Sequence, residues 1–194
     1  MAIDPWSFGH VALTGRAQSG KDTAATALEL AGWKRAAFAD PLKAMALSID
    51  PIVEVHTHAG TSFLHLTKVV RAVGWDEAKR HGDVRRFLQR LGTNGVRDHL
   101  GRDVWVDATM ARVEVPTVFT DVRFPNEADA VRARGGIVVR IVRREIADVP
   151  GHVSESAMDG YAVDATITND GTVDGLHLAV RRLVATSVAP AVVE

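Results

Sequence analysis

The segment Gly15–Thr23 is the feature that most limits what this chain can fold into. It reads GRAQSGKDT, in which two glycines are separated by four residues and the second is followed directly by a lysine. A short apolar run, His10–Thr14, precedes it, and the segment KDTAATALELAG spaces its alanines and leucines as a helix does. The glycines let backbone N–H groups turn toward phosphate oxygens, the helix start adds partial positive charge, and the lysine reaches the phosphates. We therefore predict a phosphate-binding loop between a buried strand and a helix.

The residue after the lysine departs from the usual form of such a loop. A serine or threonine normally follows, and its hydroxyl ligates Mg²⁺. Here Asp22 follows Lys21, and Thr23 comes next. Two alternatives stay open: the Asp22 carboxylate acts on the metal shell, directly or through water, or Thr23 supplies the hydroxyl. Both residues are candidate metal-shell residues.

The order of apolar segments predicts an α/β fold. Helical patterns separate five candidate strands, at residues 10–14, 36–39, 117–121, 137–142 and 164–168. Strands that alternate with helices favour a mainly parallel sheet covered on both faces, which is a three-layer αβα architecture. A helix is expected from Asp40, as N-cap, to about Ser48. Another is expected after residues 123–127 and ends at about Arg134. Residues 50–82 have partial helical periodicity, and we interpret them as a helical segment with mobile connections.

Composition excludes several classes of protein. The 194 residues carry 23 Lys and Arg against 24 Asp and Glu, so no overall basic field recruits nucleic acid. The absence of cysteine excludes disulfides, thiolate nucleophiles and cysteine-type zinc sites. No apolar run approaches the ~20 residues of a membrane-spanning helix, and the first ten residues lack the regions of a signal peptide. We expect a cytoplasmic protein with one domain over residues 1–194, and no membrane partner.

A second group of polar residues follows the strand expected at residues 117–121. Asp121 ends that strand, and Arg123 and Glu127 come soon after it. Ligands of open α/β sheets bind at the carboxyl ends of strands, so we expect Asp121 and Arg123 beside the phosphate-binding loop. The aspartate can hold a metal shell or a substrate hydroxyl, and the arginine can clamp phosphate. The alternative is an aspartate that caps the next helix, paired with a surface arginine.

Two further groups of cations are candidates. The first lies on a helix that begins at Asp83, and it comprises Arg85, Arg86, Gln89 and Arg90, followed beyond Gly92 by Arg97 and Arg102. Trp105, which comes after it, either stacks on a base or fills the core. The second lies in the polar segment of residues 143–163, which resembles a lid and carries Arg143, Arg144, His152, Ser154 and Glu155. Mobile arginines can close over a transferring phosphoryl group, although charged helix faces and loop arginines are often merely solvated.

Taken together, these motifs resemble the deoxynucleoside monophosphate kinases of tailed bacteriophages, a branch of the P-loop nucleoside monophosphate kinases. The resemblance rests on GRAQSGKDTAA, FADPLK, RRFLQRLG with the following DVW, TDVRFPNEADA and HVSE, which span about residues 10–170. It implies Mg²⁺-dependent transfer of the γ-phosphoryl group of ATP to a deoxynucleoside 5′-monophosphate (dNMP). Asp22 followed by Thr23 is normal in this branch.

The resemblance also implies site residues. The ATP-binding residues would be Gly15, Arg16, Ser19, Gly20, Lys21, Asp22 and Thr23. The dNMP-binding residues would be Leu42, Lys43, Arg86, Gln89, Gly92, Trp105, Asp121, Arg123 and Glu127. The catalytic residues would be Lys21, Asp121, Arg123 and Arg143. A substrate-binding arm would cover about residues 50–110 and a lid about residues 143–163.

Several alternatives remain at this stage. Residues 50–82 match the family pattern poorly, which leaves base preference open, and a homodimer is one option for the oligomeric state. A dephospho-coenzyme A kinase relative is a second enzyme candidate, in which Asp40 would activate a ribose hydroxyl. A non-catalytic ATP-binding module is a third.

Overall fold

The computed structural model describes residues 9–58, 60–144 and 157–186. The chain forms two compact units, which we call the core unit (residues 1–38 and 109–194) and the arm unit (residues 39–108). Within the described ranges, no helix is both long enough and apolar enough to cross a membrane.

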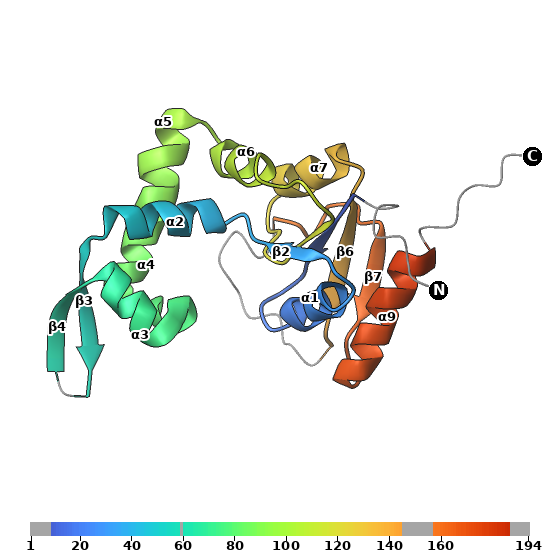
Figure 1. The fold of residues 1–194 in the computed structure, drawn as a ribbon, viewed down its shortest axis with the longest axis horizontal. Coiled ribbons are helices and arrows are strands. Elements are labelled where there is room, and N and C mark those ends of the chain that lie inside the picture. The colour runs from blue at the N-terminus through green and yellow to red at the C-terminus, as the bar shows by residue number, and fades with distance from the viewer. Residues whose placement is uncertain (1–8, 59, 145–156, 187–194) are drawn as a thin grey trace, which may run out of the picture. The chain divides into compact units, whose positions relative to one another are not determined.

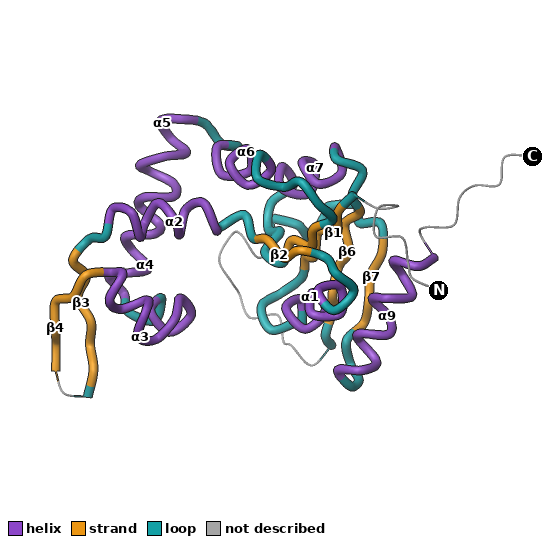
Figure 2. Tube along the Cα trace, in the orientation of Figure 1, coloured by secondary structure: helices purple, strands orange, loops and turns teal. Residues whose placement is uncertain are grey.

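The core unit is built on a parallel sheet. Its strands are β1 (His10–Thr14), β2 (Lys34–Ala36), β5 (Thr117–Phe119), β6 (Ile137–Val142) and β7 (Ala165–Thr168). They lie in the order β2-β5-β1-β6-β7, and every neighbouring pair is parallel (Figures 1 and 2). The chain places β2 and β5 on one side of β1 and then β6 and β7 on the other. The order therefore reverses at β1, and such a switch point is where ligands bind in open α/β sheets.

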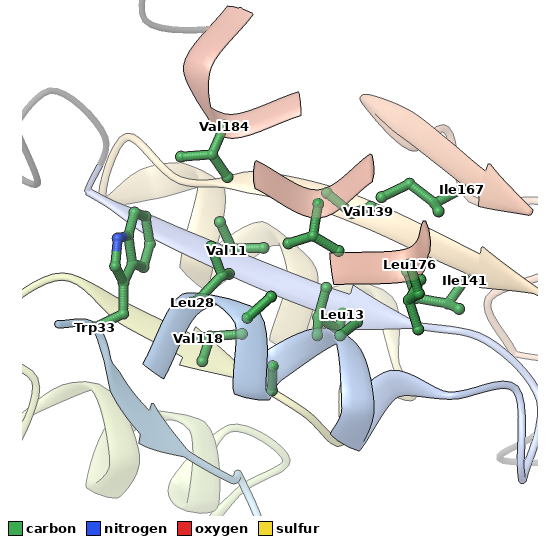
Figure 3. Close-up of a cluster of buried hydrophobic side chains, with 14 residues drawn as sticks. Val11, Leu13, Leu28, Trp33, Val118, Val139, Ile141, Ile167, Leu176 and Val184 are labelled. Carbon is green, nitrogen blue, oxygen red and sulfur yellow. The ribbon is translucent and has the colours of Figure 1, made fainter. Parts of the chain in front are cut away.

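Helices cover both faces of this sheet. Helices α1 (Lys21–Glu29) and α9 (Val173–Thr186) cover one face, and α7 (Pro125–Ala133) packs on β1 and β6 from the other (Figure 1). The buried face of α1 is mostly alanine, which lets the helix approach the strands closely. Figure 3 shows the core on this side, where side chains of β1, β6, α1 and α9 meet. The predicted three-layer αβα architecture is confirmed.

The second strand does not have the predicted bounds. The apolar run at residues 36–39 predicts a strand there, but β2 is Lys34–Ala36 and pairs only with β5. After Ala36 the chain leaves the sheet, and the buried ring of Phe38 stacks on Phe119 with the ring centroids 5.0 Å apart. The apolar character of this run therefore reflects packing of Phe38 in the core.

The arm unit contains helices and one small sheet. Its elements in chain order are α2 (Asp40–Ile49), β3 (Ile52–Thr57), β4 (Gly60–His65), α3 (Leu66–Ala78), α4 (Gly82–Gln89), the π-helical segment η1 (Arg90–Arg97) and α5 (Asp98–Leu100). Helix α6 (Val104–Met110) follows and leads into the core unit. The helix expected after Asp40 is α2, but Ala39 rather than Asp40 is its N-cap.

The prediction of a helical segment with mobile connections at residues 50–82 is wrong for its first half. Strands β3 and β4 form an antiparallel hairpin, visible as two strands in Figure 2. Val53 and Val55 are buried, whereas the side chains of Ile52 and His56 are exposed. This alternation has the period of two that a half-buried strand requires. The helical spacing belongs to α3, which starts only at Leu66.

Asp83 joins α4 to the hairpin and should make the arm unit sensitive to acid. Its carboxylate accepts hydrogen bonds from the Glu54 main-chain N–H and the Arg86 guanidinium, each 3.0 Å long. These bonds hold the pKa of Asp83 below its usual range. A lowered folded-state pKa stabilises the fold above the unfolded pKa of about 4, and this stabilisation is lost as pH falls through the folded value.

We therefore expect Asp83→Asn to melt at a lower temperature than the wild type at pH 7, with the two melting temperatures converging as the pH falls below the unfolded pKa and through the folded-state pKa. The group is partly exposed, so solvent screening limits the effect to about 1 kcal/mol. Thermal melts from pH 3 to pH 7 measure it, with Asp76→Asn, at an exposed carboxylate of α3, as the matched control. A melting difference that does not depend on pH would contradict this account of Asp83.

Candidate functional site

The loop between β1 and α1 has a backbone that only glycine allows at two positions. Gly15 and Gly20 have φ values of 138° and 101°. A Cβ on Gly15 would lie 2.2 Å from the Ile141 carbonyl oxygen, and one on Gly20 would lie 2.3 Å from Nδ2 of Asn169. Both positions therefore require glycine, for conformation and for space. The structure places the loop between a buried strand and the start of a helix, as predicted.

Lys21 is the first residue of α1 and its side chain folds back over the loop. Its Nζ donates hydrogen bonds of 2.8 Å to the carbonyl oxygens of Gly15 and Arg16. The ammonium group is thus held above the loop, at the positive end of the α1 dipole. Both contributions favour an anion at this point.

A cavity of about 240 Å³ opens beside this loop, at the carboxyl ends of β1, β5 and β6. Five cationic side chains contribute to its lining: Arg16, Lys21, Arg123, Arg140 and Arg143. Among the described residues of the lining, Asp159 is the one acidic side chain, and it pairs with Arg16 at 3.1 Å. Arg140 donates to the carbonyl oxygens of Met158 and Tyr161, which keeps the segment carrying Asp159 against β6. The excess of positive charge makes the cavity suitable for an anion.

Ser19 contributes an unusual buried group to the same loop. Its hydroxyl oxygen is buried and makes no hydrogen bond to any described residue. Buried polar atoms nearly always have a partner, and exceptions often mark the place of a ligand. Ser19 also lines the 240 Å³ cavity. The hydroxyl is thus available to a ligand oxygen bound there.

A second cavity, of about 410 Å³, lies beside the first turn of α1. Lys21, Asp22, Thr23, Arg143 and Asn169 contribute to its lining. The Asp22 carboxylate forms an ion pair with Arg35 of β2 and is otherwise exposed. Over the described part of the chain, no group of three or more His, Asp or Glu side chains could hold a metal ion.

The oxygen donors of Asp22 and Thr23 fit a magnesium ion that the protein ligates only in part. Mg²⁺ is commonly held by one or two protein oxygen ligands together with phosphate oxygens and water. A carboxylate at Asp22 and a hydroxyl at Thr23, next to the anion cavity, supply that kind of partial shell.

Of the predicted site residues after β5, the two carboxylates hold main-chain groups, whereas the arginine is exposed. Asp121 accepts a 2.7 Å hydrogen bond from the Phe38 main-chain N–H, which ties the end of β5 to the chain after β2. Glu127 is only 5% exposed and accepts hydrogen bonds from the main-chain N–H groups of Arg123 and Phe124, at 2.7 and 3.1 Å. The carboxylate that caps the start of α7 is therefore Glu127. By holding this turn, it places the exposed Arg123 side chain along the 240 Å³ cavity.

Three of the six predicted site residues in the arm unit form one contact group. A Cβ on Gly92 would lie 3.0 Å from Leu42, and the Trp105 indole Nε1 donates a 3.0 Å hydrogen bond to the Gly92 carbonyl oxygen. Trp105 is only 4% exposed. The burial of its ring favours the expectation that it fills a core.

The other three predicted residues of the arm unit are polar. Lys43 pairs with Asp40 at 3.4 Å, and Gln89 is exposed at the end of α4. Arg86 pairs with Asp83 and lines a cavity of about 340 Å³ together with Arg90. Pro51, Phe87 and Leu91 supply apolar lining to the same cavity.

The lid candidates are described only at their edges. Arg143 follows β6 and lines both cavities of the core unit. Arg144 is held by Asp170, which accepts from its main-chain N–H at 2.9 Å and pairs with its guanidinium at 3.2 Å. His152, Ser154 and Glu155 lie outside the described residues.

Three contributors to the site are missing from the sequence-based set: Arg140, Asp159 and Asn169. Asn169 follows the end of β7, so the rule that ligands bind at strand carboxyl ends could have indicated it. No local pattern marks Arg140 or Asp159, because the pairing of β1 with β6 and the return of residues 157–164 bring them to the cavity.

Comparison with known proteins gives consistent matches. A family model described as deoxynucleotide monophosphate kinase matches residues 47–180. A protein of Acanthamoeba polyphaga mimivirus that carries the same kinase name is 29% identical over 184 residues, covering 86% of this chain and 91% of the relative. The deoxynucleotide monophosphate kinases of Escherichia phage RB69 and Enterobacteria phage T4 are 29% and 30% identical, over 52% and 50% of this chain. These two matches span 44% of each phage protein.

Solved structures give weaker likenesses. Shikimate kinase from Acinetobacter baumannii in complex with shikimate has a TM-score of 0.48 at 14% identity, covering 93% of this chain and 94% of that chain. Shikimate kinase from Aquifex aeolicus has a TM-score of 0.49 at 10% identity, with coverage of 93% and 98%.

Proposed function

We propose that this chain, which belongs to the deoxynucleotide monophosphate kinase family, transfers the γ-phosphoryl group of ATP to a dNMP. The products would be ADP and a deoxynucleoside diphosphate. Membership of the family makes the chain a nucleotide kinase. The observation that carries the finer proposal is the cationic cavity beside the glycine loop, at the sheet's switch point. Such a cavity suits the phosphates of a donor nucleotide.

The donor phosphates would be held by the loop and by Lys21. Phosphoryl transfer requires in-line geometry and neutralisation of the equatorial oxygens, and it needs little covalent chemistry from the protein. Loop N–H groups, the Ser19 hydroxyl and the Lys21 ammonium group supply donors and charge on one side of the cavity. Gly15, Arg16 and Gly20 would complete this donor site.

Asp22 and Thr23 would hold Mg²⁺, if the metal accompanies the nucleotide. When bound, the metal would supply positive charge that neutralises the charge developing on the phosphates. Asp22 would have to exchange or share its ion pair with Arg35 to do so, whereas Thr23 needs no such exchange. This difference favours Thr23 as the direct ligand and Asp22 as a residue of the outer shell.

The acceptor phosphate would be gripped by arginine. Arg123 is the candidate in the core unit and Arg86 the candidate in the arm unit. Arg143 would stabilise the transferring group, because it lines both cavities beside the loop. The acceptor phosphate is already a nucleophile near neutral pH, so no general base is required. Leu42, Lys43, Gln89 and Gly92 would shape the nucleoside site, and the buried Trp105 would support it through its hydrogen bond to Gly92. Asp121 and Glu127 would fix the end of β5.

A coupled assay of ADP formation tests the proposal. The full chain is incubated with ATP and Mg²⁺, and each of the four common dNMPs, dephospho-coenzyme A or no acceptor is added. ADP formation that depends on a dNMP is expected, and a Lys21→Ala chain purified in parallel controls for contaminating kinases. ADP formation with dephospho-coenzyme A alone, or at the same rate without any acceptor, would overturn the proposal.

Replacing Arg123 or Arg86 by lysine should weaken the acceptor side selectively. Lysine keeps the charge but loses the planar fork that binds phosphate through two hydrogen bonds. We expect KM for the dNMP to rise on the order of tenfold, which corresponds to about 1.4 kcal/mol, with KM for ATP within twofold of wild type.

Steady-state kinetics with either substrate varied measure this effect. Arg80→Lys, at an exposed arginine that pairs with Glu77 at the end of α3, is the matched control. If a lysine variant changes only the ATP parameter, that arginine belongs to the donor side.

A further inference from the structure

Asn169 lies where the sheet meets the phosphate-binding loop. It is the first residue after β7, and its main-chain N–H donates a 2.7 Å hydrogen bond to the Val142 carbonyl oxygen at the end of β6. Its side-chain Nδ2 donates a 2.9 Å hydrogen bond to the Ser19 carbonyl oxygen. The main chain of Asn169 is thus fixed to the sheet, while its side chain holds the loop.

This hydrogen bond determines how one peptide group of the loop is oriented. In a planar trans peptide the C=O and N–H groups point in opposite directions. Because Asn169 holds the Ser19 carbonyl, the N–H of Gly20 must point away from Asn169. Gly20 is the N-cap of α1, so its N–H belongs to the set of donors that a helix start offers to an anion.

The side chain of Asn169 also explains the space at Gly20. A Cβ on Gly20 would lie 2.3 Å from Nδ2 of Asn169 and 3.4 Å from Leu176 of α9. His177, the residue of α9 directly after Leu176, places its Nε2 3.0 Å from the Thr23 carbonyl oxygen of α1. The segment from β7 into α9 therefore supports both the last residue of the loop and the first turn of the helix.

We propose that Asn169 is a positioning residue for donor-phosphate binding, acting through the Ser19–Gly20 peptide. The inference rests on the proposed function only in taking ATP as the ligand of the loop. Without the side-chain donor, the peptide is free to rotate, and the loop loses part of its preorganised set of N–H groups. Loss of this donor should weaken ATP binding and leave dNMP binding unchanged.

Two variants of the full chain test this role. Asn169→Ala removes the donor, and Asn169→Asp keeps the shape but replaces the donor with an acceptor and adds negative charge beside the phosphates. We expect the Kd and KM for ATP to rise on the order of tenfold for Asn169→Ala and further for Asn169→Asp. KM for the dNMP should stay within twofold. Thr166→Ala, at an exposed residue of β7, is the matched control and should behave as wild type.

Titration calorimetry with ATP, steady-state kinetics and thermal melts are measured on the same preparations. If both variants are folded and bind ATP as wild type does, the inference is wrong. It is equally wrong if the ATP and dNMP parameters worsen together with the melting temperature, because that pattern indicates a structural role.

The binding measurement separates this inference from the proposed function. A wild-type chain that binds ATP but transfers nothing to a dNMP would overturn the proposed function, and the ATP affinities of the variants would still decide the role of Asn169. A wild-type chain that does not bind ATP would overturn both.

Discussion

Replacing Lys21 by alanine should lower kcat/KM by on the order of 10³-fold or more and leave the fold intact. The ammonium group lies over the loop through hydrogen bonds to Gly15 and Arg16, where its charge can act on phosphate oxygens. Removing a preorganised cation of this kind costs roughly 4 kcal/mol at the transition state. The side chain is partly exposed and lies outside the apolar cluster of the core, so packing should be preserved.

The measurement is dNMP-dependent ADP formation, together with the melting temperature. Lys34→Ala removes a cation from the exposed face of β2 and is the matched control for loss of charge in the same unit. A folded Lys21→Ala chain with near-normal turnover would show that the glycine loop does not hold the transferring phosphate. Loss of both activity and thermal stability would mean that Lys21 acts by supporting the loop.

Most of the core unit could be predicted because its signals are local. Strand β1 is a short apolar run, the loop after it has glycines and a lysine at fixed spacing, and α1 has helical periodicity. Strand β6 is rich in β-branched residues, and a glycine pair precedes it. Each of these patterns depends only on residues that are close together in the sequence. The structure confirms the elements and the layered architecture that they indicate.

The arm unit was less predictable because its elements depend on tertiary contacts. The hairpin of β3 and β4 has only a two-residue alternation at Val53 and Val55, which the helical periodicity of the following residues masks. The π-helical segment η1 cannot be inferred from spacing. In the structure Leu42 packs against its Gly92, and the Gly92 carbonyl accepts a hydrogen bond from Trp105. Sequence periodicity reports neither contact.

The candidate site shows the same division. The sequence indicates which residues carry charge, but not which of them the fold uses for support. Glu127 illustrates this, because its carboxylate is consumed by two main-chain N–H groups of the turn after β5. Asn169 is the converse case, since its neighbours Asp170 and Gly171 suggest only a turn, whereas its side chain contacts a loop 150 residues earlier in the chain.

Replacing Trp105 by alanine should destabilise the protein by about 3–5 kcal/mol, the usual cost of removing a buried tryptophan side chain. The ring is 4% exposed, so its loss leaves a cavity. The substitution also removes the hydrogen bond to the Gly92 carbonyl within η1. In a π-helix the main-chain hydrogen bonds join residues i and i+5, and the indole N–H adds a side-chain donor to one carbonyl of this segment.

Trp105→Phe separates the ring from its donor. Phenylalanine fills most of the space but leaves the buried Gly92 carbonyl without this partner, which should cost about 1–3 kcal/mol. Thermal or urea unfolding of both variants gives the free energies of unfolding.

The ratio of kcat/KM for a dNMP to that for the matching ribonucleotide is measured in parallel. A tryptophan that crowds the sugar would reject an added hydroxyl by about 10–200-fold. We expect the ratio to stay within twofold while stability falls. A drop in this ratio in a Trp105→Ala chain of near-normal stability would contradict this expectation. The ring would then line the sugar pocket, and its burial in the arm unit would not be what maintains η1.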